Sequence, residues 1–470
     1  MEKKKVLLTG ASGSMGGEAF TELLRRRDKY DIVILLRPSA KNKKAFAQYE
    51  GQAGLKIVWG DLRNFDDVLE AVNGVDHVLH PAAMIAPEAD HNPPLCKSIN
   101  CGSIENIIAA IKQQPDNGDN VRLANVCSVA AYGDRLPPIH MVRVGDPLKP
   151  SIGDFYATTK IAAERTVIES GLKYWASMRQ TYIAIPDALS LMDPIMFHQP
   201  VNTHIELITG EDAGYGLVQT IEAPDEFYGR VYNMGGGPSC RVVFGDYMAR
   251  MMKLFGLGDY RKIMSLNWYA IRNFHCCWYE DSWVLNEYLG HWRHSLEDHY
   301  RQVEEVIPWY LKFGGRIAPA FIVKAFMRRM ADPLKWIKTN DVEKIKAFFG
   351  SREAWENIPD WDHYVDTDSG GDTLRTIEDA RELAESRGGQ CLSGGSGDIN
   401  EKLSWRCGFG HEWEASKRLL QAGHWCPECA APPWDYDSKA KVDPALAKIY
   451  YNNHGENESQ FVEYLYCPNE

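Results

Sequence analysis

A glycine-rich loop close to the start of the chain constrains the fold more than any other feature. The segment KKVLLTGASGSMGGEAF predicts a buried strand over residues 6–9, a tight turn and then a helix. Its glycines follow a G-x-x-G-x-x-G spacing, which suits close approach of the backbone to a pyrophosphate at a helix N-terminus. Three glycines alone also fit an ordinary strand-to-helix turn, but the flanking strand and helix favour a nucleotide site. We predict that this site is formed by Gly10, Ser12, Gly13, Ser14, Met15 and Gly16.

Strands and helices alternate through the first part of the chain. Further strands are expected within residues 30–39, 55–62, 77–84 and 121–134. This alternation predicts the α/β class, with a doubly wound parallel sheet of the Rossmann type. The residues that follow the third and fourth expected strands are candidate cofactor contacts, namely Asp61, Leu62, Ala82 and Ala83. The carboxylate can reach an adenine amine, and the alanines are small enough for a cofactor to pass close by.

The end of the second expected strand distinguishes two cofactors. An acidic residue there would bind the ribose 2'-hydroxyl of NAD, but this chain has Arg37. Lys41, Lys43 and Lys44 follow, and such a cationic cluster suits the additional 2'-phosphate of NADP. The alternative is a solvated basic loop beside an NAD site. The sequence therefore predicts NADP(H), with NAD(H) as the alternative.

A tyrosine and a lysine provide candidate catalytic groups. Tyr156 and Lys160 are four residues apart, so they share one face of a helix. A lysine beside a tyrosine stabilises the phenolate, which predicts a lowered tyrosine pKa and proton exchange with a carbonyl oxygen. Ser128, at the end of an expected strand, can hydrogen-bond the same oxygen. The Y-x-x-x-K pair is a weak signal alone and gains weight from following the glycine loop, Asp61 and Ser128 in order.

These motifs together resemble the extended short-chain dehydrogenase/reductases, the NAD(P)-dependent epimerase/dehydratase family. The resemblance is carried by TGASGSMGG, GDL, HPAAM, SIN, CSVAAYG, YATTK, RVYNMGGG and LNEYLGHWRHSLED, and it covers residues 1–315. It implies a Rossmann domain with a smaller substrate lobe and a catalytic triad of Ser128, Tyr156 and Lys160. It also implies that Asn100 supports the active site and that Tyr156 and Lys160 contact the cofactor.

Two departures bear on the substrate. Family members that dehydrate nucleotide sugars usually have an acidic pair after the catalytic serine or threonine, whereas this chain has Val129 and Ala130. Residues 180–210, in the expected substrate lobe, contain no arginine to hold a pyrophosphate. We therefore expect an NADP(H)-dependent oxidoreductase that interconverts a carbonyl and an alcohol on a small apolar substrate. The alternatives are a nucleotide-sugar epimerase with tightly bound NAD and a non-enzymatic NADP-binding sensor or scaffold.

A cluster of cysteine and histidine lies near the other end of the chain. The candidate metal ligands are two spaced pairs, Cys407 with His411 and Cys426 with Cys429. Three sulfurs and one nitrogen suit tetrahedral structural zinc and leave no position open for substrate. The segments GGQCLS, EKLSWRC, GHEW and GHWCPECA resemble small zinc-ribbon modules, which places a zinc-ribbon domain at residues 371–470. Residues 316–370 are expected to form a helical connector and an acidic linker.

Charge limits the partners that this chain can have. The formal net charge is −12, and residues 371–470 contain 10 Lys and Arg against 17 Asp and Glu, so nucleic acid is not expected as a partner. We expect a homodimer that acts on a small molecule.

Other features of the sequence bear on where the protein is found. No apolar run is long enough for a transmembrane segment, and the start does not resemble a signal peptide. The sparse cysteines suit a reducing cytoplasm.

Two further segments, residues 316–337 and residues 275–277, each allow a structural and a functional interpretation. Residues 316–337 are amphipathic and could lie on a membrane surface, but a helix docked on the protein is the favoured interpretation. His275, Cys276 and Cys277 could bind metal or sense oxidants, but packing in the core is the favoured interpretation because no further ligand pair is nearby.

Overall fold

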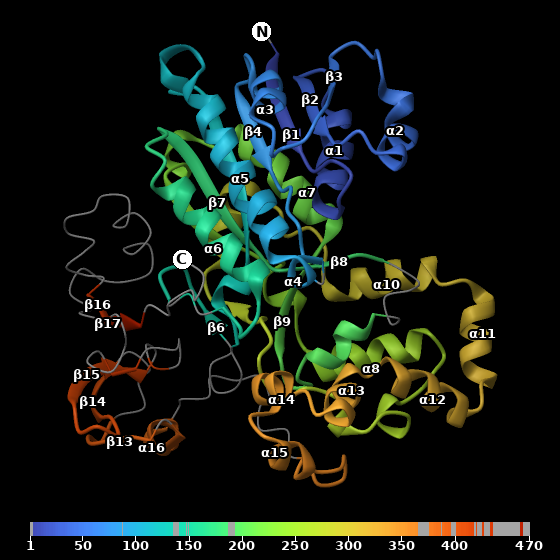
Figure 1. Cartoon of the computed structure of the whole chain (residues 1–470), viewed down its shortest axis with the longest axis vertical. Helices are drawn as coiled ribbons and strands as arrows, with labels where there is room; N and C mark the ends of the chain where they lie inside the picture. The colour runs from blue at the N-terminus through green and yellow to red at the C-terminus, as the bar shows by residue number, and fades with distance from the viewer. Residues whose placement is uncertain are drawn as a thin grey trace.

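The computed structural model describes residues 3–86, 88–134, 141–146, 148, 150–186, 193–364, 376–386, 388–395, 401–417, 420, 425–426, 433–435 and 461–463. A parallel sheet of seven strands forms its centre (Figure 1). In sheet order the strands are β10 (Arg230–Met234), β7 (Tyr174–Gln180), β5 (Arg122–Ser128), β4 (His77–His80), β1 (Lys4–Thr9), β2 (Tyr30–Leu36) and β3 (Leu55–Trp59). This order confirms the predicted doubly wound fold.

Helices cover both faces of this sheet because neighbouring residues of each strand point to opposite sides. Val6 and Leu8 of β1 pack with one set of helices, whereas Leu7 packs with the other. The first set consists of α1 (Ser14–Arg25), α7 (Gly210–Gln219) and α9 (Ser282–Leu289). The second consists of α3 (Phe65–Val72), α5 (Pro93–Lys112) and α6 (Phe155–Ile168). The shorter helices α2 (Ala40–Phe46) and α4 (Glu88–His91) follow β2 and β4.

A smaller lobe lies below the sheet in Figure 1 and has its own apolar core. Its sheet contains β8 (Tyr182–Ala184), β9 (His204–Thr209) and β11 (Arg241–Val243), and a second pair joins β6 (Met141–Val142) to β12 (Trp278–Tyr279). Its helices are α8 (Phe244–Leu254), α10 (Leu296–Val306), α11 (Trp309–Ile317), α12 (Ala320–Met330), α13 (Asp332–Thr339), α14 (Val342–Phe349) and α15 (Arg352–Glu356). Met327 and Ala331 are buried in this core, so the expected connector packs on the lobe by part of its surface.

The C-terminal region has a separate small core. The helix α16 (Ile377–Ser386) packs against an antiparallel sheet of β13 (Gln390–Cys391), β14 (Lys402–Arg406) and β15 (Glu412–Ser416). Thr376 and Asp379 form a capping box at the start of α16, because each side chain accepts a hydrogen bond from the other residue's backbone N–H. Trp405 is completely buried at the centre of this core. The short strands β16 (Pro433–Asp435) and β17 (Phe461–Glu463) pair with each other.

Within the described residues, no helix has both the length and the apolar character needed to cross a bilayer.

Candidate active site

A cavity of about 1000 Å³ runs along the carboxyl ends of the central strands and continues into the small lobe. Its wall includes Gly10 after β1, Arg37 after β2, Gly60 after β3 and Ala82 after β4. Because β1 lies between β2 and β4, the chain leaves β1 at the point where the strand order reverses. Open α/β sheets bind ligands at this point. The sheet therefore places the predicted cofactor residues around one space.

The glycine loop leaves no room for side chains at two positions. Gly10 has a φ of +64°, and a Cβ there would approach the Ala82 Cα to 2.9 Å. A Cβ on Gly16 would approach the Gly10 carbonyl oxygen to 2.1 Å. Gly13 is the N-cap of α1 and lines the cavity, so the first turn of this helix faces the space. These features fit a dinucleotide, whose pyrophosphate would lie at the N-terminus of α1.

Two arginines lie at the far end of this cofactor space. Arg37 and Arg63 both line it, together with the buried Asn42. The Asp61 carboxylate also lines the cavity and accepts a hydrogen bond from Arg63 Nη2 at 2.7 Å, and this contact holds the pKa of Asp61 below its usual value. Lys41 has an exposed side chain at the start of α2 and is not among the residues that line the cavity. The sequence predicts two cationic contacts at this end, Arg37 and Lys41. The structure places Arg37 in the cavity wall but not Lys41.

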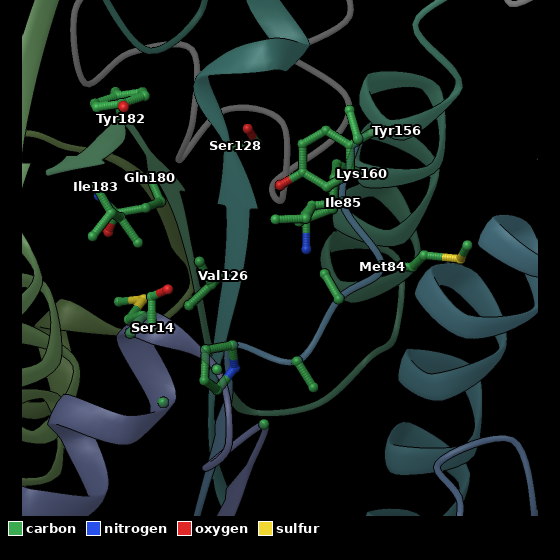
Figure 2. Close-up of a pocket in the computed structure, with 18 of the residues that line it drawn as sticks. Ser14, Met84, Ile85, Val126, Ser128, Tyr156, Lys160, Gln180, Tyr182 and Ile183 are labelled. Carbon is green, nitrogen blue, oxygen red and sulfur yellow. The ribbon is translucent and has the colours of Figure 1, made fainter. Parts of the chain in front are cut away.

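The three candidate catalytic side chains meet in the middle of the cavity. Figure 2 shows Tyr156 and Lys160 projecting from α6 toward the end of β5, where Ser128 lies. Gln180 and Ile183 lie across the cavity from them (Figure 2). Tyr156 begins one turn of α6 that ends with Lys160, which explains their common direction. The structure therefore brings together the residues that the Y-x-x-x-K pattern and the strand end predict.

The pKa values of Tyr156 and Lys160 depend mainly on their burial. Burial is the largest influence on Tyr156 and raises the pKa of its phenol, while a hydrogen bond with Ser128 acts in the lowering direction. Burial also lowers the pKa of Lys160. Charged forms are disfavoured in a low-dielectric interior, and this applies to the phenolate and to the ammonium alike. In this structure burial therefore outweighs the lowering expected from the lysine, and the pKa of Tyr156 lies above its usual value.

Asn100 joins the loop after β4 to α6, the candidate catalytic helix that carries Tyr156 and Lys160. Its side-chain oxygen accepts a hydrogen bond from the Met84 N–H at 2.7 Å, and its amide donates to the Met84 carbonyl oxygen at 3.0 Å. The same amide donates to Thr159 Oγ1 at 2.9 Å, next to Lys160 on α6. Asn100 is 3% exposed and is not among the residues that line the cavity. It therefore acts as a positioning residue in this structure.

A buried ion pair holds the other side of α6. Arg179 Nη2 of β7 donates to Glu164 Oε1 of α6 at 2.7 Å, and both side chains are at least 95% buried. Ser177 Oγ donates to the second Glu164 oxygen at 2.9 Å. Arg179 Nη1 also donates at 2.7 Å to the hydroxyl of Tyr132, which lies four residues after Ser128. This network therefore ties the catalytic helix to the strand and the turn beside Ser128.

Replacement of Glu164 by alanine is expected to lower the free energy of unfolding by about 3 to 5 kcal/mol, because it leaves the Arg179 charge buried and unpaired. Denaturant titration measures this change. The exposed pair of Arg165 and Glu169 on the same helix is the control, and Glu169→Ala is expected to change stability by less than about 1 kcal/mol. Equal losses for the two variants would contradict the role of the buried pair.

The lobe end of the cavity has an apolar lining. Its wall includes Ile183, Ile185, Ile195, Met196, Phe244, Tyr247, Met248, Met251 and Phe274. No lysine or arginine occurs among the described residues that line it on the lobe side. The polar groups there that sequence reasoning missed are Gln180, Thr181, Tyr182, Asp193, Gln199 and His275. No local sequence motif marks these residues as part of the cavity wall. They reach it only because of their place after β7 or in the lobe.

Cys276 packs in the core of the lobe, as expected, and also lines the cavity, whereas His275 is only partly buried and lines the cavity as well. His275 Nδ1 lies 2.7 Å from Asp154 Oδ2. Asp154 is also the N-cap of the catalytic helix, where its Oδ1 accepts a hydrogen bond from the Ala157 N–H. His275 therefore connects the lobe to the start of α6. Cys277 is 1% exposed in the core, as expected.

Three of the four candidate metal ligands are also brought together. Cys407 and His411 lie on the turn between β14 and β15, and His411 Nδ1 is 3.5 Å from Cys407 Sγ and 3.7 Å from Cys426 Sγ. Ligands bound to one tetrahedral zinc at about 2.0 to 2.3 Å are separated by about 3.5 Å, so these three atoms fit such an ion. Cys429 lies outside the described residues. Cys391 packs against the core of this module and is not part of the cluster.

Comparison with known proteins agrees with this geometry. Residues 6–182 match the model of the NAD dependent epimerase/dehydratase family. A UDP-N-acetylglucosamine 4,6-dehydratase (inverting) from Campylobacter jejuni is 30% identical over 109 residues, which are 23% of this chain and 32% of the relative. A UDP-glucose 4-epimerase from Rickettsia massiliae is 30% identical over 111 residues, again 23% of this chain and 32% of the relative. The chain thus spans about a third of the length of these curated relatives.

Solved structures share the fold of the sheet and the lobe. A double mutant of DesIV, a dTDP-glucose 4,6-dehydratase from Streptomyces venezuelae with NAD and DAU bound, has a TM-score of 0.53 and 18% identity. The likeness covers 67% of this chain and 99% of that one. A dTDP-glucose 4,6-dehydratase from Bacillus anthracis in complex with NAD has a TM-score of 0.52 and 15% identity, over 66% of this chain and 97% of that one. These solved structures show a shared fold, and residues 6–182 are similar to the NAD dependent epimerase/dehydratase family that their motifs resemble.

Proposed function

We propose that this protein is an NAD(P)-dependent enzyme that oxidises or reduces one carbon of a nucleotide sugar, in the manner of an epimerase. The observation that carries the proposal is the meeting of Ser128, Tyr156 and Lys160 in a cavity continuous with the glycine loop. Proton transfer and dinucleotide binding thus share one space.

A bound nicotinamide dinucleotide would supply or accept the hydride. The residues that would hold it are those of the glycine loop, Arg37, Asp61, Leu62, Ala82 and Ala83. The two arginines at the far end support NADP, because guanidinium groups bind a phosphate in paired hydrogen bonds. The solved relatives named above contain NAD, which makes NAD the alternative.

The protein's own groups would handle the proton. In the direction of reduction, the Tyr156 phenol would donate its proton to the carbonyl oxygen of the substrate, and Ser128 would hydrogen-bond the same oxygen. Lys160 would stabilise the phenolate that results. In the direction of oxidation the phenolate would accept the proton of an alcohol. Asn100, Glu164 and Arg179 would position these groups.

The nucleotide-sugar class is supported by the names of the curated relatives, which act on UDP sugars. Among such reactions we favour epimerisation over dehydration, because Val129 and Ala130 after Ser128 offer no acid or base for removal of water. A second candidate is a reductase of small apolar carbonyl compounds. It is supported by the apolar lobe end of the cavity, whose described lining contains no cation to pair with a pyrophosphate.

One experiment tests these alternatives. The purified protein is denatured, the released nucleotide is identified, and fresh protein is then incubated with UDP-glucose, UDP-N-acetylglucosamine and a series of apolar ketones with NADPH. An epimerase is expected to convert a UDP sugar without net consumption of added cofactor. Stoichiometric NADPH oxidation with a ketone would instead support the second candidate. Failure to bind either dinucleotide would contradict both.

We also propose that the C-terminal module binds one structural Zn²⁺ through Cys407, His411, Cys426 and Cys429. The mutual distances of the first three support this assignment.

A further inference from the structure

The helices α11 and α12 present large apolar side chains to the outside. The side chains of this surface, which we call the aromatic face, are Trp309 (76% exposed), Tyr310 (59%), Phe313 (56%), Ile317 (64%), Phe321 (73%), Ile322 (52%) and Phe326 (45%). Single exposed apolar residues are normal, but seven large ones on two successive helices mark an interaction site. The helices within residues 316–337 dock on the lobe, as expected, because Met327 and Ala331 pack in its core, but the side that carries the aromatic face stays exposed.

Tight backbone packing fixes the side that α11 shows to solvent. A Cβ on Gly315 would approach the Phe255 carbonyl oxygen to 2.1 Å, and one on Gly256 would approach the Lys312 carbonyl oxygen to 2.4 Å. The helix thus contacts the lobe by its glycine side. With about 100° of rotation per residue, Trp309, Tyr310, Phe313 and Ile317 all fall on the side opposite Gly315. Their exposure follows from how α11 is anchored.

The second helix is anchored in the same way. Met327 of α12 is 2% exposed, and Val323 and Met330 pack against the same core. An α-helix turns by about 100° per residue, which places Phe321 and Arg328 on the side opposite Val323, Met327 and Met330. Both side chains therefore point away from this core. The outer side of α12 therefore combines aromatic and cationic groups.

The charge of this segment is opposite to that of the whole chain. Residues 307–331 contain five lysines and arginines and no aspartate or glutamate, whereas the formal net charge of the chain is −12. A two-fold contact between copies would bring the same five cations of each copy together with no acid of the segment to pair with them. A surface of anionic lipid offers both negative headgroups for the cations and an apolar interior for the aromatic side chains.

We propose that α11 and α12 form a docking site for the surface of an anionic lipid bilayer. The aromatic face enters the headgroup region, and the arginines and lysines contact lipid phosphates. The site belongs to the substrate lobe, because Met327 packs in the same core as Met248 and Met251, which line the cavity. The described part of the C-terminal module lies on the opposite side of the view in Figure 1, so it leaves this face open.

Flotation of the full-length protein with lipid vesicles tests the proposal. The protein is expected to float with phosphatidylcholine vesicles that contain about a third phosphatidylglycerol, and less with pure phosphatidylcholine. High salt is expected to weaken the binding. The triple variant Phe313→Ser, Ile317→Ser, Phe321→Ser is expected to lower the partition coefficient by at least about tenfold, because it removes apolar area from the interface.

A matched control replaces exposed apolar side chains elsewhere, with Ile152→Ser, Trp283→Ser and Val342→Ser, and is expected to bind vesicles like the parent protein. Arg328→Glu with Arg329→Glu tests the charge and is expected to abolish the preference for anionic lipid. Equal binding by the parent and the aromatic-face variant would overturn the proposal. So would a dimer, measured by sedimentation, that the same variant dissociates. Dinucleotide binding by the variant separates this outcome from failure of the proposed function.

Discussion

Replacement of Tyr156 by phenylalanine is expected to lower kcat by about a hundredfold to ten-thousandfold, because the variant lacks the hydroxyl that exchanges the proton with the substrate. The ring remains, so packing beside Ser128 and Lys160 and the affinity for the dinucleotide are expected to stay close to those of the parent protein. Steady-state kinetics on a substrate found in the turnover screen measures the first effect, and fluorescence titration of the reduced dinucleotide measures the second.

Tyr182 provides the control for this prediction. It also lines the cavity but is 48% exposed and lies on β8, across from α6. Tyr182→Phe is expected to retain most of the turnover. Full activity of the Tyr156 variant would remove the basis of the proposed chemistry, whereas loss of dinucleotide binding would show a defect in folding instead.

Removal of the zinc ion proposed for the C-terminal module is expected to unfold this module and to leave the dinucleotide domain folded. Structural zinc sites contribute about 10 to 16 kcal/mol of apparent binding free energy, which exceeds what a core of this size supplies. Cys407→Ser is therefore expected to abolish zinc binding and to expose Trp405, which is completely buried. Metal analysis and the emission wavelength of tryptophan fluorescence report these two changes.

Cys391→Ser is the matched control for the metal site, because this thiol lies in the same module but outside the ligand cluster. The variant is expected to retain about one zinc ion per chain. A parent protein that contains no zinc when purified without chelators, and that binds none when zinc is added, would refute the assignment.

Much of the dinucleotide domain could be predicted because its signals are local. The strand, turn and helix around Gly10 need only neighbouring residues, and the spacing of Tyr156 and Lys160 fixes their common direction on any helix. The alternation of strands and helices also restricts the topology to few solutions. These features therefore follow from short stretches of sequence.

Other parts of the site depend on contacts between distant residues. His275 enters the cavity wall more than a hundred residues after Tyr156, and no spacing in the sequence pairs it with Asp154. The partnership of Glu164 with Arg179 likewise requires the packing of α6 on β7. An amphipathic pattern in α11 and α12 shows that one side is apolar, but it does not show whether protein or solvent lies against that side. Tertiary packing decides all three.

The position of the buried ion pair also fixes the candidate catalytic residues to one part of the molecule. Glu164 lies one turn after Lys160, and Arg179 immediately precedes the last residue of β7, Gln180. The pair thus joins the catalytic helix rigidly to the sheet up to the end of that strand. The chain enters the small lobe directly afterwards, through Thr181 and β8. Any movement of the lobe relative to the sheet would therefore leave Tyr156 and Lys160 fixed to the sheet, because Glu164 and Arg179 hold α6 on β7.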